Sequence, residues 1–243
     1  MNLEENTMKY RSLKDLEHAT FAITEGMMFD QWVSSSLPEA CFAYYRTVFD
    51  CLSALKEGEV DAFPYDEAVL TYLAANLLDS YAILTDEKLE AADYGFAVNL
   101  SRPDLKQAMD ETIAEIKANG IYEEMMDRWF PKAGVLGIKP DIKLNGKNGT
   151  IRFGTSAVDR PFTFVVGDHV ITGFDVELAR RICSKLEMDL EISDMVFSEL
   201  IPALVSGKVD MIGSGITITQ DRSEKVLFSV PYFHGRIAIL VKK

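Results

Sequence analysis

The strongest constraint on the fold is the regular alternation of short apolar runs with segments of helical periodicity. The run "ATFAITEG" (19–26) is typical of a strand that ends in a turn at Gly26, and the helix-like "FDQWVSSSL" follows it. The strand-like "CFAYYR" and "VDAFPYD" are each followed by a helical segment in the same way. This alternation is the signature of α/β proteins. We therefore predict an α/β fold.

Two such regions flank a segment without periodicity. Residues 131–150, "PKAGVLGIKPDIKLNGKNGT", are rich in glycine and proline, and we predict that they form a linker. Residues 102–130 before it have a helical period that breaks at Asn119-Gly120. After the linker, strands and helices alternate again from "IRFGTS" (151–156) onward.

A short internal repeat supports two related halves. The segments "SALKEGEVDAFPYD" (53–66) and "PALVSGKVDMIGSG" (202–215) share the pattern A-L-x-x-G-x-V-D. The pattern predicts a helix stopped by a glycine, followed by a strand with an aspartate at its start. Two such units favour two related lobes.

Charge and motifs exclude several function classes. Asp and Glu number 38 against 25 Lys and Arg, a formal charge of −13, so a nucleic acid or an anionic membrane surface is not an expected partner. His18, His169 and His234 lie in no nucleophile motif and have no metal-ligand spacing, and a GxxxxGK[ST] phosphate loop is absent from the sequence. We therefore predict no catalytic residue, no metal and no cofactor.

Cysteines and the first residues give weaker expectations. Cys41, Cys51 and Cys183 have no CxxC spacing, so we expect three small buried side chains, with at most one disulfide as the alternative. The start "MNLEENTMKY" has no cationic region followed by an apolar one, and no apolar run approaches the ~20 residues of a membrane span. The protein is then expected to be cytoplasmic, or to have an export signal outside this sequence.

The stretch "ALVSGKVDMIGSGITITQDR" (203–222) is the best candidate for a ligand site. It places small and polar residues just beyond a buried strand, where open α/β sheets bind ligands. Gly215 allows close approach of the backbone, Thr217 offers a hydroxyl, and Arg222 offers a planar fork suited to a carboxylate. The alternative is a solvated arginine in a polar loop.

Two further strand ends carry candidate residues. In "AITEGMMFD" the N–H groups of a helix start favour an anion, although Met27 adds no hydroxyl. In "VDAFPYDE" the strand ends in Tyr65 and Asp66. Asp66 either binds a ligand ammonium or caps the next helix, and the local sequence favours capping.

Together, "GFDVELARRI", "FSELIPALVSGKVDMIGSGITITQDR" and "VLFSVPYF" resemble the periplasmic amino-acid-binding proteins of ABC transporters, solute-binding protein family 3. Residues 11–130 resemble the same family through "RSLKDL", "GEVDAFPYDEAVL" and "AEIKANGIYEEMMDRWF". The resemblance implies a two-lobed α/β fold of periplasmic-binding-protein type II, the Venus flytrap. It also implies a non-catalytic protein that binds an amino acid between its lobes.

The segments resemble the family in permuted order. The resemblance assigns lobe 2 to residues 9–97, the returning helical segment of lobe 1 to 98–130, the linker to 131–150, and the N-terminal part of lobe 1 to 151–243. A circular permutant and a piece of tandem flytraps both explain this order, whether natural or engineered. One of the two chain segments that connect the lobes is then expected to be interrupted at Lys243, which would loosen the hinge between them.

Helix 102–130 is expected to pack on the sheet of 151–240 through an apolar stripe, namely Leu105, Ala108, Met109, Ile113 and Ile116.

The resemblance also implies roles for single residues. Arg222 would bind the ligand α-carboxylate, with Thr217, Ser214 and the backbone around Gly215. Asp66 would bind the α-ammonium beside Tyr65, and Phe197 would pack on the ligand side chain.

Two positions depart from the family pattern. Gly26-Met27 stands where the family usually has Gly-Thr, which removes one hydroxyl from the carboxylate site. Asp159 stands where an aromatic residue is frequent, and an acid there favours a polar or cationic ligand side chain.

The implied partners are an amino acid and an ABC permease, in the periplasm or outside the cell, with the full-length protein tethered to the membrane. An extracellular sensing module of a tandem-flytrap receptor is the alternative, and a dehydratase-like enzyme a third. A monomer is expected, with a domain-swapped dimer as the alternative.

Overall fold

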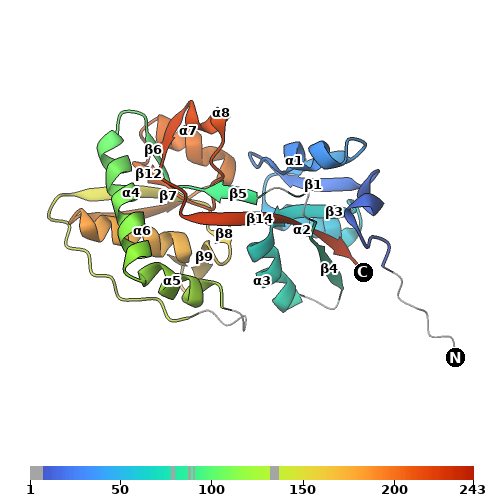
Figure 1. Ribbon diagram of the computed structural model, residues 1–243, viewed down its shortest axis with the longest axis horizontal. Helices are drawn as coiled ribbons and strands as arrows, with labels where there is room; N and C mark the ends of the chain where they lie inside the picture. Colours follow the sequence, from blue (N-terminus) through green and yellow to red (C-terminus); the bar gives the residue numbers. More distant parts are fainter. Residues whose placement is uncertain (1–7, 78–79, 87–88, 90, 132–136) are drawn as a thin grey trace. The chain divides into compact units, whose positions relative to one another are not determined.

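The computed structural model describes residues 8–77, 80–86, 89, 91–131 and 137–243. The chain divides into two compact units (Figure 1). Unit 1 comprises Met1–Ala91 and Gly235–Lys243, and unit 2 comprises Ala92–His234. Both units combine strands with helices, so the predicted α/β class is confirmed.

Unit 1 is built on a mixed sheet with the order β2-β1-β3-β14-β4, in which β1 pairs parallel with β2 and β3, and β14 pairs antiparallel with β3 and β4. Strand β5 also pairs with β14. The strands of this sheet are β1 (Thr20–Thr24), β2 (Cys41–Tyr45), β3 (Ala62–Asp66), β4 (Tyr81–Leu84), β5 (Ala91–Tyr94) and β14 (Phe233–Lys242), of which β5 and β14 each include residues assigned to unit 2. The helices of unit 1 are η1 (Leu13–Leu16), α1 (Phe29–Ser36), α2 (Val48–Glu57) and α3 (Glu67–Leu77).

Unit 2 has one sheet with the order β11-β7-β12-β6-β13 and a smaller one with the order β10-β9-β8. Its strands are β6 (Ala97–Asn99), β7 (Thr150–Thr155), β8 (Val158–Asp159), β9 (Thr163–Val166), β10 (Val170–Thr172), β11 (Asp189–Asp194), β12 (Met211–Ile212) and β13 (Val226–Phe228). Its helices are α4 (Pro103–Ala118), α5 (Ile121–Trp129), α6 (Phe174–Lys185), η2 (Phe197–Glu199), α7 (Leu200–Val205) and α8 (Gln220–Ser223).

The internal repeat forms the same local structure in each unit. Asp61 and Asp210, the aspartates of the two copies, each precede the third strand of their sheet. The Asp61 carboxylate accepts a hydrogen bond from the Thr20 amide at 3.0 Å, and the Asp210 carboxylate accepts one from the Arg152 amide at 2.9 Å. In return, each aspartate amide donates to the carbonyl of the same partner at 2.8 Å. The repeat therefore fixes β3 beside β1 in one sheet and β12 beside β7 in the other.

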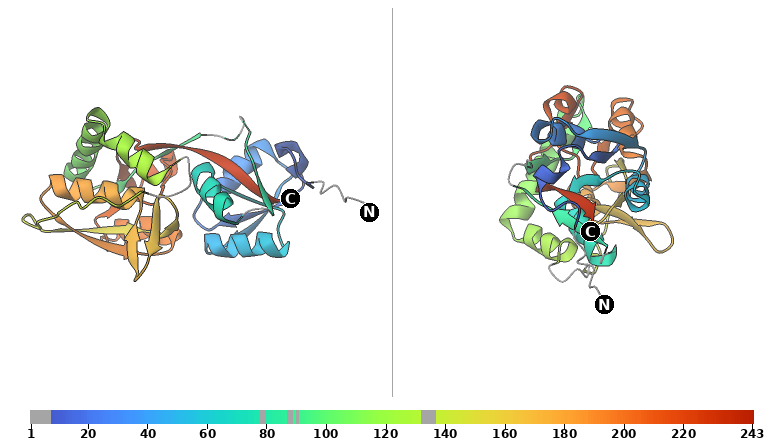
Figure 2. Two further views of the ribbon diagram at one scale, coloured as in Figure 1. Left: turned by 90° about the horizontal axis from the view of Figure 1, so that it is seen from below. Right: turned by 90° about the vertical axis from the view of Figure 1, so that its right-hand side faces the viewer.

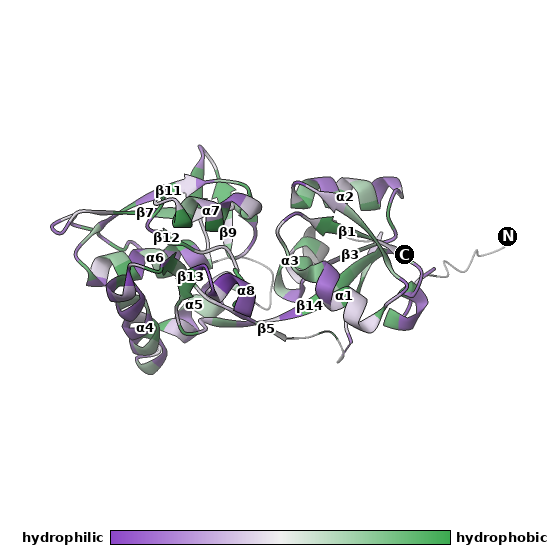
Figure 3. Cartoon of the chain, turned by 90° about the horizontal axis from the view of Figure 1, so that it is seen from above, coloured by the Kyte–Doolittle hydropathy of each residue, from purple (hydrophilic) through white to green (hydrophobic). Residues whose placement is uncertain are grey.

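Helix α4 buries its apolar stripe within unit 2. Leu105, Met109 and Ile113 are at most 2% exposed, and the helix contacts β6 and β13. The Asp110 carboxylate accepts from the Val230 amide at 2.7 Å. On the side seen in Figure 3, α4 is largely hydrophilic. The pattern read from the sequence thus places this helix on the unit 2 sheet.

The unit boundaries differ from the expected ones at two points. Residues 92–97 belong to unit 2, and 235–243 belong to unit 1. The reason for the second difference is β14, which runs on into the unit 1 sheet and pairs there with β3 and β4 (Figure 2). The chain therefore passes between the units at Ala91–Ala92 and again at His234–Gly235. This division differs from the expectation that the second crossing is interrupted at Lys243.

Gly173 offers a direct test of the packing in unit 2. Its φ is +134°, and an added Cβ would collide with the carbonyl group of Phe162. Gly173→Ala should lower the free energy of unfolding by more than the roughly 1–2 kcal/mol that a left-handed alanine costs by itself. Gly167→Ala is the matched control, because Gly167 has a φ of +48° and open space around it. Equal losses in urea denaturation of the two variants would contradict the close approach.

Candidate functional site

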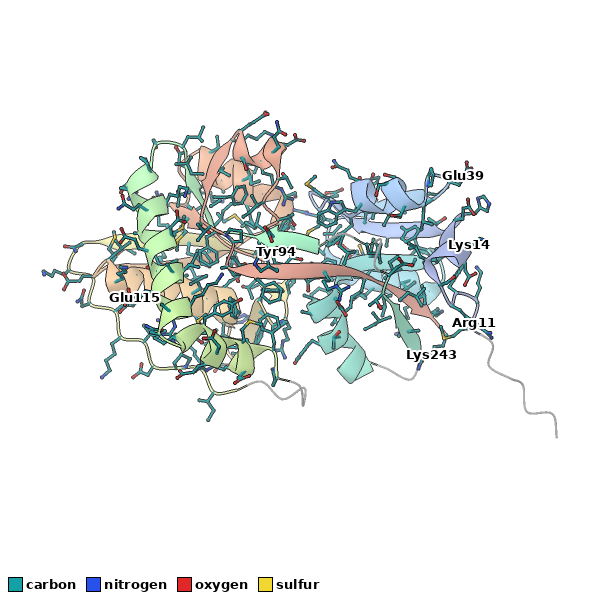
Figure 4. All side chains as sticks on the ribbon, in the orientation of Figure 1. Arg11, Lys14, Glu39, Tyr94, Glu115 and Lys243 are labelled. Carbon is teal, nitrogen blue, oxygen red and sulfur yellow. The ribbon has the colours of Figure 1, made fainter. Side chains whose placement is uncertain are left out.

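The loop after β12 is held to its surroundings at several points. Ser214 lies 2% exposed, and its hydroxyl accepts from the Ser156 amide and donates to the Ser156 carbonyl, both at 3.2 Å. Thr217 forms an antiparallel bridge with Tyr94, which Figure 4 labels. Gly215 has a φ of +57°, which favours glycine, and its amide donates to Oδ2 of Asp175 at 2.9 Å. The loop therefore has one fixed conformation.

Arg222 lies in α8 at the end of this loop and is 8% exposed. Its Nη1 donates to the Thr217 carbonyl at 2.9 Å, and its Cζ lies 5.6 Å from the ring centroid of Phe197. Burial lowers the pKa of Arg222 to about 10, so the group still carries its charge at neutral pH. The alternative of a solvated arginine is wrong, because the side chain is buried. A poorly solvated guanidinium attracts an anion more strongly than an exposed one does.

Two buried acids lie near this loop. Asp159, in β8, is 4% exposed, and Asp175, at the start of α6, is fully buried. Burial raises the pKa of Asp175 to about 7, and the charge of Asp159 adds to the rise. The hydroxyl of Tyr232 lies beside the Asp175 carboxylate. This part of unit 2 thus combines a buried cation with buried acids.

In unit 1, Asp66 ends β3 and is 5% exposed. Its Oδ1 accepts from the amides of Ala68 at 2.8 Å and Val69 at 3.3 Å. The capping role that the local sequence favours is confirmed.

The other candidates of unit 1 lie in two different environments. Tyr65 is 2% exposed, and its ring packs 5.1 Å from that of Phe63 and 5.2 Å from that of Phe29, within the core of this unit. Gly26, with a φ of +81°, and Met27 form the turn between β1 and α1, where the Met27 amide donates to the Thr24 carbonyl at 3.1 Å. Because β1 and β3 are adjacent parallel strands, the turn and Asp66 lie at the same edge of the sheet.

The structure thus groups Arg222, Thr217, Gly215, Ser214 and Phe197 in unit 2, and Asp66 with the Gly26 turn in unit 1. Sequence reasoning missed Asp175. Its segment "GFDVELARRI" was noticed only as part of a resemblance, because an aspartate in the first turn of a helix is ordinary.

The cysteines differ in part from expectation. Cys51 and Cys183 are buried and free, and burial raises the pKa of Cys51 to about 11 and that of Cys183 to about 12. Cys41 is free as well, but it is exposed on the edge strand β2, so the expectation of burial is wrong there.

Over the described ranges, no cluster of three or more His, Cys, Asp or Glu side chains could hold a metal ion. Within the same ranges, no helix is long and apolar enough to cross a membrane.

Comparison with known proteins gives matches to the C-terminal part of the chain. Residues 151–243 match the bacterial extracellular solute-binding proteins, family 3. The "ABC transporter arginine-binding protein 1" of Escherichia coli (strain K12) is 36% identical over 93 residues, 38% of this chain and 38% of its own length. The "Arginine-binding extracellular protein ArtP" of Bacillus subtilis (strain 168) is 42% identical over 99 residues, 41% of this chain and 38% of its own length.

A solved structure of the arginine-bound form of truncated ArgBP from T. maritima is 46% identical, with a TM-score of 0.35. The match covers 36% of this chain and 42% of that chain. The chain therefore spans about two-fifths of the length of the curated relatives it matches. The similarity to the bacterial extracellular solute-binding proteins, family 3, is confined to residues 151–243.

Proposed function

We propose that this protein binds an amino acid without catalysing a reaction, and that Arg222 binds the ligand α-carboxylate. The observation that carries the proposal is the burial of a charged guanidinium in α8, after the loop that follows β12, against Phe197 and the Thr217 carbonyl. A guanidinium fork matches a carboxylate with two parallel hydrogen bonds. Thr217 and the Gly215 loop complete this half of the site.

The α-ammonium of the ligand is assigned to Asp66 of unit 1. This carboxylate is buried and caps α3, so it is fixed in place before a ligand arrives. A fixed carboxylate loses little conformational entropy when it binds an ammonium group. Met27 and Gly26 contribute backbone groups only, whereas the buried Tyr65 shapes the strand end from the core side.

The ligand side chain is assigned to the region of Asp159 and Phe197. A buried acid favours a cationic group, and an aromatic face also attracts one. Two relatives whose names state arginine binding support the same choice. We therefore assign a basic amino acid, with arginine as the first candidate.

Asp66→Asn tests the assignment of the ammonium. Asparagine caps a helix about as well as aspartate, so the fold should be retained. The loss of charge should weaken arginine binding by about 10- to 100-fold, since hydrogen bonds to charged groups contribute about 1.5–3 kcal/mol. An arginine analogue without its α-amino group should bind both proteins equally in calorimetry. If that analogue binds the unmutated protein as tightly as arginine does, the zwitterion assignment fails.

The physiological role proposed for this binding is delivery of the amino acid to an ABC permease from the periplasm or the cell exterior. The match of residues 151–243 to a family of extracellular proteins supports this location. A sensing module of a receptor is the second candidate. In proteoliposomes with an ABC amino-acid permease, the loaded protein should stimulate ATP hydrolysis, and a sensing module should not.

A further inference from the structure

Asp175 is a fully buried acid whose two bonding partners belong to different segments. Its amide donates to the Phe162 carbonyl at 2.9 Å, and its Oδ2 accepts from the Gly215 amide at 2.9 Å. Helix α6 begins at Phe174, so Asp175 stands in the rigid first turn of a helix. The residue therefore connects the start of α6 to the middle of the loop that leads to Arg222.

The loop transmits this connection to the guanidinium. Gly215 is two residues before Thr217, whose carbonyl accepts the hydrogen bond from Arg222 Nη1. The Gly95 amide donates a hydrogen bond to the Ile216 carbonyl at 3.0 Å and so fixes the side of the loop that faces away from α6 toward the segment between β5 and β6. If the hydrogen bond from the Gly215 amide to Asp175 were lost, the side of the loop that faces α6 would no longer be held. Thr217 and the Arg222 side chain would then be able to adopt more conformations.

The ionised form of Asp175 also destabilises the folded state. A buried carboxylate costs several kcal/mol unless it is well paired, and its neighbours here include a phenol and a further acid. Tyr232 lies beside it, Tyr94 next to Tyr232, and Asp159 adds a like charge. A fold selected for stability alone would place a neutral amide here, which accepts the same hydrogen bond without a buried charge.

We propose that Asp175 is a positioning residue for ligand binding, whose ionised side chain fixes the Gly215 loop and thereby the Arg222 guanidinium. This inference rests on the proposed function of Arg222. A charged acceptor forms a hydrogen bond roughly twice as strong as a neutral one. Protonation of Asp175 therefore loosens the loop without breaking it, and removal of the side chain leaves the Gly215 amide unpaired.

The pH dependence separates positioning from a structural role. Since the pKa of Asp175 is raised to about 7 in the folded protein, from 3.8 for a free side chain, protonation favours the folded state. The contribution of this group to stability rises as the pH falls through about 7, and it is lost as the pH rises. Ligand affinity should change in the opposite direction and fall as the pH drops from about 8 to 6.

The experiment compares unmutated protein, Asp175→Asn and Asp175→Ala by arginine titration between about pH 6 and 8, with affinity measured for the folded fraction. The unmutated protein should lose affinity about threefold or more toward pH 6, and Asp175→Asn should show no such dependence. Asp175→Ala should bind at least about tenfold more weakly at pH 8. Asp210→Asn is the matched control, because Asp210 also binds a backbone amide but lies at the other end of β12. Its affinity should be unchanged.

The Gly215 amide resonance in ¹⁵N NMR gives a readout that needs no ligand. It should shift with pH around 7 in the unmutated protein and stay constant in Asp175→Asn. A resonance that ignores both pH and the substitution overturns the positioning role, as does equal arginine affinity in all three proteins. One outcome separates the two proposals: the unmutated protein binds no amino acid, but this resonance titrates as expected. The proposed function then fails, together with the role of Asp175 in ligand binding. The link between Asp175 and the Gly215 loop is upheld.

Discussion

Arg222→Ala is expected to weaken arginine binding by about 2–5 kcal/mol, which corresponds to a loss of roughly 30-fold or more. In the proposed assignment, the substitution removes the cation that pairs with the ligand carboxylate, and this cation is only 8% exposed. Isothermal titration calorimetry measures the effect directly. A variant within about threefold of the unmutated protein would contradict the assignment of the carboxylate site.

Two further variants locate the cause of that loss. Arg222→Lys keeps the charge but loses the planar fork, so its affinity should lie between those of the alanine variant and the unmutated protein. Arg102→Ala removes an arginine of unit 2 that pairs with the exposed Asp104. The affinity of that control should be unchanged, because Arg102 lies outside the proposed site.

Glu177→Ala should produce the largest loss of stability, about 3–5 kcal/mol, because it leaves buried cations without their partner. Glu177 is 2% exposed and accepts hydrogen bonds from Arg128, Trp129 and Arg181, with distances between 2.6 and 3.1 Å. It thereby ties the end of α5 to α6. Both arginine side chains are only 17% exposed, so water cannot replace the carboxylate well.

Urea denaturation of Glu177→Ala and Glu115→Ala provides the comparison. Glu115, labelled in Figure 4, pairs with Lys185 on the surface of α4 and is 61% exposed. Exposed ion pairs of this kind contribute about 0–1 kcal/mol. If the two variants lose the same free energy of unfolding, Glu177 does not hold α5 on α6 as described.

Local sequence patterns predicted the parts of the fold that depend on neighbouring residues. The period of 105–116 identified the buried face of α4, and the repeated A-L-x-x-G-x-V-D identified two equivalent helix–strand units. The strand-end position of the loop before Arg222 likewise followed from an apolar run bounded by glycines. In each case the pattern that carried the prediction lies within one element or its direct successor, although the contacts that these elements make extend further along the chain.

Other features depend on contacts between distant segments. The pairing of β14 with β3 and β4 involves positions more than 150 residues apart, and nothing in "GRIAILVKK" specifies which sheet it joins. The role of Asp175 also depends on a distant segment, because its hydrogen-bond partner Gly215 lies 40 residues further along the chain. Tyr65 is different: strand alternation places it on the same face as the buried Phe63, so its core position was available from the sequence.

The most direct test of the central claim is a calorimetric comparison of L-arginine with agmatine, which is arginine without its α-carboxylate. The two ligands share a guanidinium side chain, so their difference isolates the group assigned to Arg222. We predict that arginine binds and that agmatine binds at least about 30-fold more weakly, in line with the 2–5 kcal/mol expected for a buried charge pair. Equal binding of the two, or no binding of any of the common amino acids, would contradict the account.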